Sequence, residues 1–157
     1  MILLAGCHVV PDQQGFHHPG SPIDAPIVQL RCAKIPYVES IAAHCWFVGL
    51  GPDVPARRWE VWQEPRGNHG HLQIDCRPAF AGVGAGESWV LAEFHGPQAQ
   101  RLLAILDRPE EYPWRQTYRY WPGPNSNTYV AWVLGKAKID APLPPAAIGA
   151  GYVIRAD

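Results

Sequence analysis

The sequence predicts an α+β fold in which an antiparallel sheet of about five strands packs against two helices. Short stretches rich in Val, Ile, Phe and Trp recur along the chain, which is typical of strands. Two later stretches space their apolar residues as a helix does. The 15 glycines and 17 prolines, about a fifth of the 157 residues, favour short elements joined by turns over a helical bundle.

The predicted strands are short apolar or alternating stretches bounded by turn residues. In the third of them Glu60 and Trp62 share one face, while Trp59 and Val61 share the other. The Gly- and Pro-bearing turn at 51–55 predicts a hairpin between the second and third strands. The predicted strands are 27–33, 40–50, 58–63, 71–76 and 89–95, with a further short aromatic strand at 117–121.

Two helices are predicted in the second half of the chain. The first runs over 98–106, where Ala99, Leu102, Leu103 and Leu106 recur at helical spacing. The second begins near residue 126, after a Pro-Gly-Pro step that excludes regular structure, and ends near 135–136. Both helices are expected to pack on the sheet.

Ser126 is expected on the first turn of the second helix. Unpaired amides and the positive end of the helix dipole stabilise an anion there, which makes this a good position for a nucleophile. The alternative is that Asn125 or Ser126 serves only as a helix N-cap, a common role for these residue types.

The sequence predicts a division into residues 1–25, expected to be a flexible leader or lipoprotein tether, and residues 26–157, expected to be a single domain. Leu3-Leu4-Ala5-Gly6-Cys7 matches a bacterial lipobox, although only six residues precede the cysteine. If the true start lies upstream, Cys7 is a lipid anchor and the protein is periplasmic or envelope-associated. If the match is chance, a cytoplasmic location stays open. No other stretch approaches the roughly 20 apolar residues of a membrane helix, so membrane contact is expected only through Cys7.

The composition excludes several classes of function. With 47% apolar and 17% charged residues, a net charge of −1 and no basic patch, the chain is not expected to bind nucleic acid. Seven tryptophans are many for this length, and some are expected to line a groove or an interface. No metal or other cofactor is expected, because His69, His71 and Cys76 lack a fourth ligand and a known spacing.

The four cysteines show no paired CxxC spacing. If Cys7 carries a lipid, three remain. One disulfide, for example between Cys32 and Cys76, is then compatible with an oxidising compartment, but the sequence does not give the connectivity.

Three residues would supply a nucleophile, a base and a carboxylate that orients the base. The Ser126 hydroxyl needs a base near neutrality, and His44 is the histidine embedded in a core-like strand. Glu60 on the partner strand would orient its ring. The helix amides near Asn127 would then face the oxyanion of a tetrahedral intermediate.

These residues also carry a resemblance. His44-Cys45-Trp46-Phe47-Val48-Gly49 resembles the histidine strand of the permuted papain-like fold, the NlpC-type and lecithin-retinol acyltransferase-like arrangement. Asn125-Ser126-Asn127-Thr128-Tyr129-Val130 resembles the Asn-Cys-Glu-His-Phe-Val motif at the start of its nucleophile helix. The order of the two motifs also matches. The resemblance implies a permuted papain-like arrangement, with Asn125, Asn127 and Thr128 around the nucleophile.

A closer resemblance is to the bacterial domain of unknown function 3750, over roughly residues 27–152. It is carried by Glu60-Val61, by the Trp-Pro-Gly-Pro-Asn-Ser-Asn-Thr run at 121–128 and by the Leu-Pro-Pro-Ala-Ala-Ile-Gly run at 143–149. The chain departs from the papain-like enzymes in one important respect. Ser126 stands where they carry cysteine, and a hydroxyl is far harder to ionise than a thiol.

Two functions from different classes follow. The first is an envelope hydrolase or acyltransferase acting on an amide or ester, in which Ser126 attacks, His44 is the base and Glu60 orients it. The second is a catalytically silent binding or structural module on the same fold. Its Trp-rich surface would dock a partner protein or the peptidoglycan cell wall.

Overall fold

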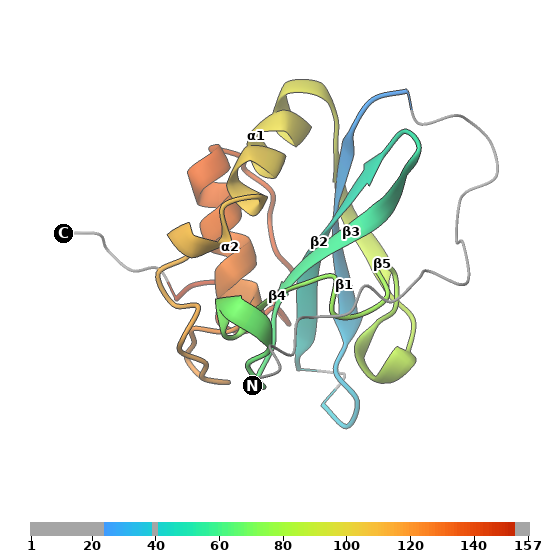
Figure 1. The fold of residues 1–157 in the computed structure, drawn as a ribbon. Coiled ribbons are helices and arrows are strands. Elements are labelled where there is room, and N and C mark those ends of the chain that lie inside the picture. Colours follow the sequence, from blue (N-terminus) through green and yellow to red (C-terminus); the bar gives the residue numbers. More distant parts are fainter. Residues whose placement is uncertain (1–23, 39–40, 153–157) are drawn as a thin grey trace, which may run out of the picture.

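The computed structural model describes residues 24–38 and 41–152. Five antiparallel strands form one sheet in the order β4-β3-β2-β1-β5, and both helices lie on one face of it (Figure 1). The strands are β1 (Ile27–Lys34), β2 (Ala43–Gly51), β3 (Val54–Val61), β4 (Leu72–Ile74) and β5 (Trp89–Phe94), and the helices are α1 (Gly96–Leu106) and α2 (Ser126–Ala137). Short 3-10 turns lie at Gly67–His69, Val83–Ala85 and Pro109–Glu111. The predicted α+β class, with a five-stranded antiparallel sheet and two helices, is confirmed.

The predicted strand at 117–121 is wrong. The backbone of this segment is used in turn contacts, because Thr117 N donates to Trp114 O and Arg119 N donates to Pro124 O. Tyr118 packs against Tyr120 at 5.2 Å between ring centroids, whereas Tyr120 and Trp121 are largely exposed to solvent. Aromatic residues are common in strands but do not by themselves determine the backbone conformation, which explains the error.

Strand β2 is buried on both faces, which accounts for its continuous apolar sequence. Cys45 and Phe47 join the main core beneath the helices, together with Val130 and Val133 of α2. Trp46 and Val48 belong to a second, smaller cluster with Ala33 and Ala79. Since successive side chains of a strand point to opposite faces, this second cluster lies on the face away from the helices.

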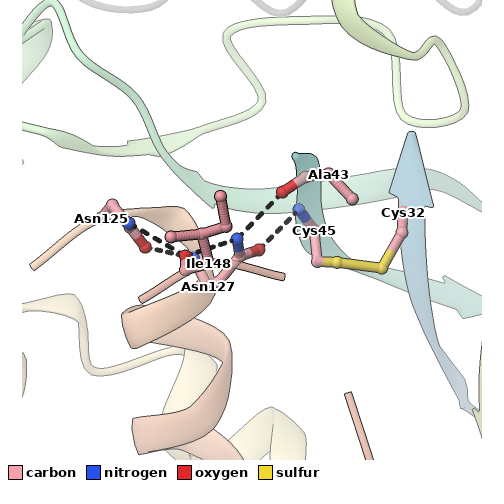
Figure 2. The surroundings of a disulfide bond; sticks show 6 residues. All are labelled: Cys32, Ala43, Cys45, Asn125, Asn127 and Ile148. Carbon is pink, nitrogen blue, oxygen red and sulfur yellow. Dashed lines mark hydrogen bonds between the residues drawn. A yellow bond between two sulfur atoms is a disulfide. The ribbon is translucent and has the colours of Figure 1, made fainter. Parts of the chain in front are cut away.

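A disulfide joins Cys32 of β1 to Cys45 of β2 (Figure 2). The antiparallel register places these two residues directly opposite each other. The pairing of Cys32 with Cys76 considered from the sequence is therefore wrong. Its error has a physical reason: connectivity depends on which strands are neighbours, and spacing along the chain does not contain that information.

Replacing Cys32 and Cys45 together by alanine should lower the free energy of unfolding by about 3 kcal/mol. The disulfide closes a loop of sequence separation 13 and restricts the unfolded chain. Urea denaturation measures the change, and the slope of free energy against urea should rise because the uncrosslinked chain exposes more surface. An unchanged midpoint with an unchanged slope contradicts this prediction.

Candidate active site

Asn125 is the N-cap of α2, which makes Ser126 the first helical residue. The Asn125 side-chain oxygen accepts hydrogen bonds from Asn127 N at 3.0 Å and from Thr128 N at 3.2 Å. Thr128 completes a capping box, because its hydroxyl accepts from Asn125 N at 3.1 Å. Capping is thus performed by Asn125 and Thr128, and the Ser126 hydroxyl takes no part in it.

Ser126 is 5% exposed, and its hydroxyl makes no hydrogen bond to any residue in the described ranges 24–38 and 41–152. The amides of Asn127 and Thr128, which the sequence placed in an oxyanion hole, already donate to the Asn125 cap. This corrects the predicted role of those two amides. The Ser126 backbone N–H donates to none of the described residues, so it is the donor of the first turn that can meet an anion.

The Asn127 side chain fastens the start of α2 to strand β2. Its oxygen accepts from Cys45 N at 3.2 Å, and its nitrogen donates to Ala43 O at 2.9 Å (Figure 2). Ala43 and Cys45 are the residues on either side of His44. The first turn of α2 therefore lies against the β2 backbone on both sides of His44. The His44 side chain itself points to the same face of the sheet as that of Trp46.

The segment 146–149 also lies on the start of α2. Ile148 O accepts from the side-chain nitrogens of both Asn125, at 3.0 Å, and Asn127, at 2.9 Å (Figure 2). Gly149 follows with a φ of 88°, and a Cβ there would collide with the Asn125 carboxamide. Only glycine suits this position, since it needs both a left-handed backbone and the absence of a side chain.

His44 and Glu60 form a buried pair. His44 Nε2 lies 2.8 Å from Glu60 Oε2, and the two residues are 4% and 1% exposed. Trp62 packs edge-on against the imidazole at 4.8 Å, and Trp46 stacks on it at 5.5 Å between ring centroids. The side chains of Glu60 and Trp62, which were predicted to share one face of their strand, both contact His44.

Two arginines complete what we call the ionic cluster, which consists of His44, Glu60, Arg58 and Arg77. Arg58 Nη2 donates to Glu60 Oε2 at 2.7 Å, and Arg77 Nη1 donates to Glu60 Oε1 at 3.1 Å. The Arg58 guanidinium lies over the Trp46 ring. The sequence interpretation missed both arginines. For Arg58 a signal existed, because it lies two residues before Glu60 on the same strand face; for Arg77 none did.

The cluster fixes the charge states of the pair. Burial would raise the pKa of Glu60, but the hydrogen bond with His44 and the charge of Arg58 outweigh it and lower that pKa to about 2. Burial lowers the pKa of His44 below its usual 6.5, and the hydrogen bond and charge of Glu60 oppose this only in part. At neutral pH Glu60 is therefore ionised and His44 is neutral.

The protonation of Glu60 also selects the tautomer of His44. An ionised carboxylate has no proton to donate, so His44 Nε2 carries the hydrogen of the 2.8 Å bond. The lone pair is then on Nδ1, which makes no hydrogen bond within the described part of the chain. His44 is thus an oriented neutral imidazole with an unused basic nitrogen.

No hydrogen bond joins Ser126 to His44 among the described residues. Hydrogen bonds between a catalytic nucleophile and its base are commonly long in ligand-free proteins.

His71, which the sequence analysis considered as a metal ligand, contacts the backbone: its Nδ1 lies 2.9 Å from Trp62 O. Within residues 24–38 and 41–152, no group of three or more His, Cys, Asp or Glu side chains could hold a metal ion, and no helix is long and apolar enough to cross a membrane. Cys7 lies outside the described residues.

A family model described as Protein of unknown function (DUF3750) matches residues 25–152. The chain belongs to this family. The DUF3750 match spans all the strands and both helices, and it includes His44, Glu60 and Ser126. Searches of curated proteins and of solved structures gave no match. The resemblance to DUF3750 seen in the sequence is confirmed, and the relationship to papain-like enzymes stays a prediction.

Proposed function

We propose that this protein is a serine-dependent hydrolase or acyltransferase that acts on an amide or ester. Ser126 is the nucleophile, His44 is the base and then the acid, and Glu60 orients His44. The backbone N–H of Ser126 stabilises the oxyanion. The fold is proposed to be a permuted papain-like arrangement, supported by the motifs around His44 and Ser126 and by their order in the chain.

One observation carries the proposal. A neutral His44 is held through Nε2 by an ionised, buried Glu60, and its Nδ1 has no partner among the described residues, on a stretch of strand fastened to the helix that begins with Ser126. Three ionisable side chains of the cluster, those of His44, Glu60 and Arg58, are buried, which is costly compared with apolar packing. An arrangement that holds one histidine in a single tautomer despite this cost in free energy is typical of a catalytic base.

The chemistry follows from this geometry. As Ser126 Oγ attacks the substrate carbonyl carbon, its proton moves to His44 Nδ1 and the carbonyl oxygen becomes an oxyanion. The C–N or C–O bond then breaks, and the leaving amine or alcohol takes the proton from His44. In the second half-reaction water or an acceptor amine or alcohol attacks the acyl carbon, and its proton moves to His44. The bond between the acyl carbon and Ser126 Oγ then breaks, and His44 returns the proton to Ser126 Oγ. Glu60 stays ionised and stabilises the imidazolium that forms in each half.

We propose the cell envelope as the location of the protein, with Cys7 as its lipid anchor. The Cys32–Cys45 disulfide supports it, because such bonds persist in oxidising compartments. The substrates that suit this location and chemistry are peptidoglycan amides and acyl esters.

A fluorophosphonate probe tests the proposal, because it reacts with activated serines. Wild-type protein should be labelled at residue 126, as read by mass spectrometry, and Ser126→Ala should not be labelled. Thr117→Ala, which removes a hydroxyl from a loop outside the ionic cluster, is the matched control and should label like the wild type. A folded wild-type protein that stays unlabelled overturns the proposal.

A second candidate is a silent binding module, and exposed aromatic rings favour it. Tyr120 and Trp121 are 67% and 75% exposed directly before the start of α2, whereas Trp46 and Trp59 are buried. Exposed aromatic rings are favoured at surfaces that contact a partner. An unlabelled Ser126, together with binding to a partner protein or peptidoglycan that Trp121→Ala weakens, would establish this candidate.

A further inference from the structure

We propose that Asn127 is a positioning residue, which sets the distance between Ser126 and His44 through its side chain. The inference rests on the proposed function. It assigns Asn127 a role different from that of an oxyanion donor, since its amide is already used by the Asn125 cap.

Strand β2 extends beyond its partner β3 at the end that carries His44. The pairing of β2 with β3 begins at Phe47, whereas its pairing with β1 covers residues 43–50. Cys45 and Cys32 are opposed with a Cα separation of 4.1 Å, the short spacing of a non-hydrogen-bonded pair. The N–H of Cys45 therefore points away from β1, toward the side that β3 leaves open.

Asn127 closes this open edge in the way that a neighbouring strand would. Its side-chain oxygen accepts from Cys45 N, and its nitrogen donates to Ala43 O (Figure 2). Ala43 N on the same edge donates to Ala146 O at 2.8 Å. One carboxamide thus pairs with both peptide groups that flank His44, in a site where Ala43, Cys45 and Asn127 are all buried.

Asparagine is the residue type that fits all three contacts. The carboxamide supplies one acceptor, used by Cys45 N, and two donors, used by Ala43 O and Ile148 O. Aspartate has the same shape but offers no donor when ionised. Because Asn127 directly follows Ser126, these contacts fix the nucleophile against the strand of the base. A displacement of about 1 Å between reacting groups can cost about 100-fold in rate.

The test compares Asn127→Asp and Asn127→Ala with the wild type in fluorophosphonate labelling of Ser126 across a range of pH. Both variants should label about 100-fold more slowly. The labelling rate of the variants should also rise continuously with pH, because hydroxide takes the place of His44 as the base. The wild-type rate should instead reach a plateau once His44 is neutral. A purely structural role would lower only the folded fraction and leave the pH profile unchanged.

Val133→Ala is the matched control, since it truncates a buried side chain of the same helix without touching β2 through a hydrogen bond. It should keep the wild-type rate and profile when measured at the same folded fraction. If a folded Asn127→Asp keeps them too, the positioning role is overturned and the proposed function stands. If neither Asn127 variant folds, Asn127 is a folding residue and the assignment is wrong. If the wild type itself is unlabelled, both proposals fail.

Discussion

Replacing His44 by glutamine should slow the labelling of Ser126 by a fluorophosphonate about 10³-fold, the size of a general-base contribution. Glutamine keeps an N–H donor for Glu60, so the buried carboxylate retains a partner in place of the 2.8 Å bond. It has no basic nitrogen to receive the proton of Ser126. Second-order rate constants of labelling, from mass-spectrometric time courses at pH 7, measure the change.

The pH profile shows whether the lost group is His44. The base acts only when it is neutral, so wild-type labelling should fall as the pH drops through the pKa of His44. Burial lowers that pKa, and the midpoint should therefore lie below 6.5. His44→Gln should lack this acidic limb. A midpoint above 6.5, or a limb that survives in the variant, would mean that another group is the base.

Local patterns predicted the elements of the fold because each element follows from its own residues. The Asn-Ser-Asn step gave the start of α2 at Ser126, and the alternation in β3 put Glu60 on one face with Trp62. Apart from the hairpin of β2 and β3, which the turn at 51–55 predicted, the same patterns do not specify which strands become neighbours. The order β4-β3-β2-β1-β5 and the Cys32–Cys45 bridge depend on that choice, and both required the structure.

The candidate site divides in the same way. Ser126, His44 and Glu60 could be chosen by residue type and by element, since nucleophile and base chemistry is carried by few side chains. The role of Arg77 could not be predicted from the sequence, because this residue lies in the turn after β4 and comes close to Glu60 only when the chain folds. The Asn127 contact to β2 was missed because it depends on where β3 leaves its neighbour.

Replacing Glu60 by alanine should lower the free energy of unfolding at pH 7 by about 3–5 kcal/mol, the cost of removing one partner from a buried ionic pair. Arg58, 1% exposed, would lose its carboxylate, and His44 Nε2 would lose its acceptor. Urea denaturation measures the loss. Glu60→Gln, which keeps the shape and removes the charge, should fall between the wild type and the alanine variant.

The same carboxylate predicts how stability depends on pH. The pKa of Glu60 is 4.5 in the unfolded chain and about 2 in the folded one, so its contribution is complete above pH 4.5 and is lost as the pH falls toward 2. A shift of this size corresponds to about 3 kcal/mol. The wild type should lose this component on acidification, and Glu60→Gln should lack it.

Glu111 provides the matched control. It also lies near two cations, with Arg108 at 2.8 Å and Lys136 at 3.6 Å, but its side chain is 32% exposed. Glu111→Gln should change the free energy of unfolding by about 1 kcal/mol or less, because water screens an exposed pair. The difference between the two substitutions then isolates burial, since both carboxylates have two cationic partners among the described residues. If Glu60→Gln cost no more than Glu111→Gln, Glu60 would not be the ionised anchor of His44, and the assignment of the tautomer would fail with it.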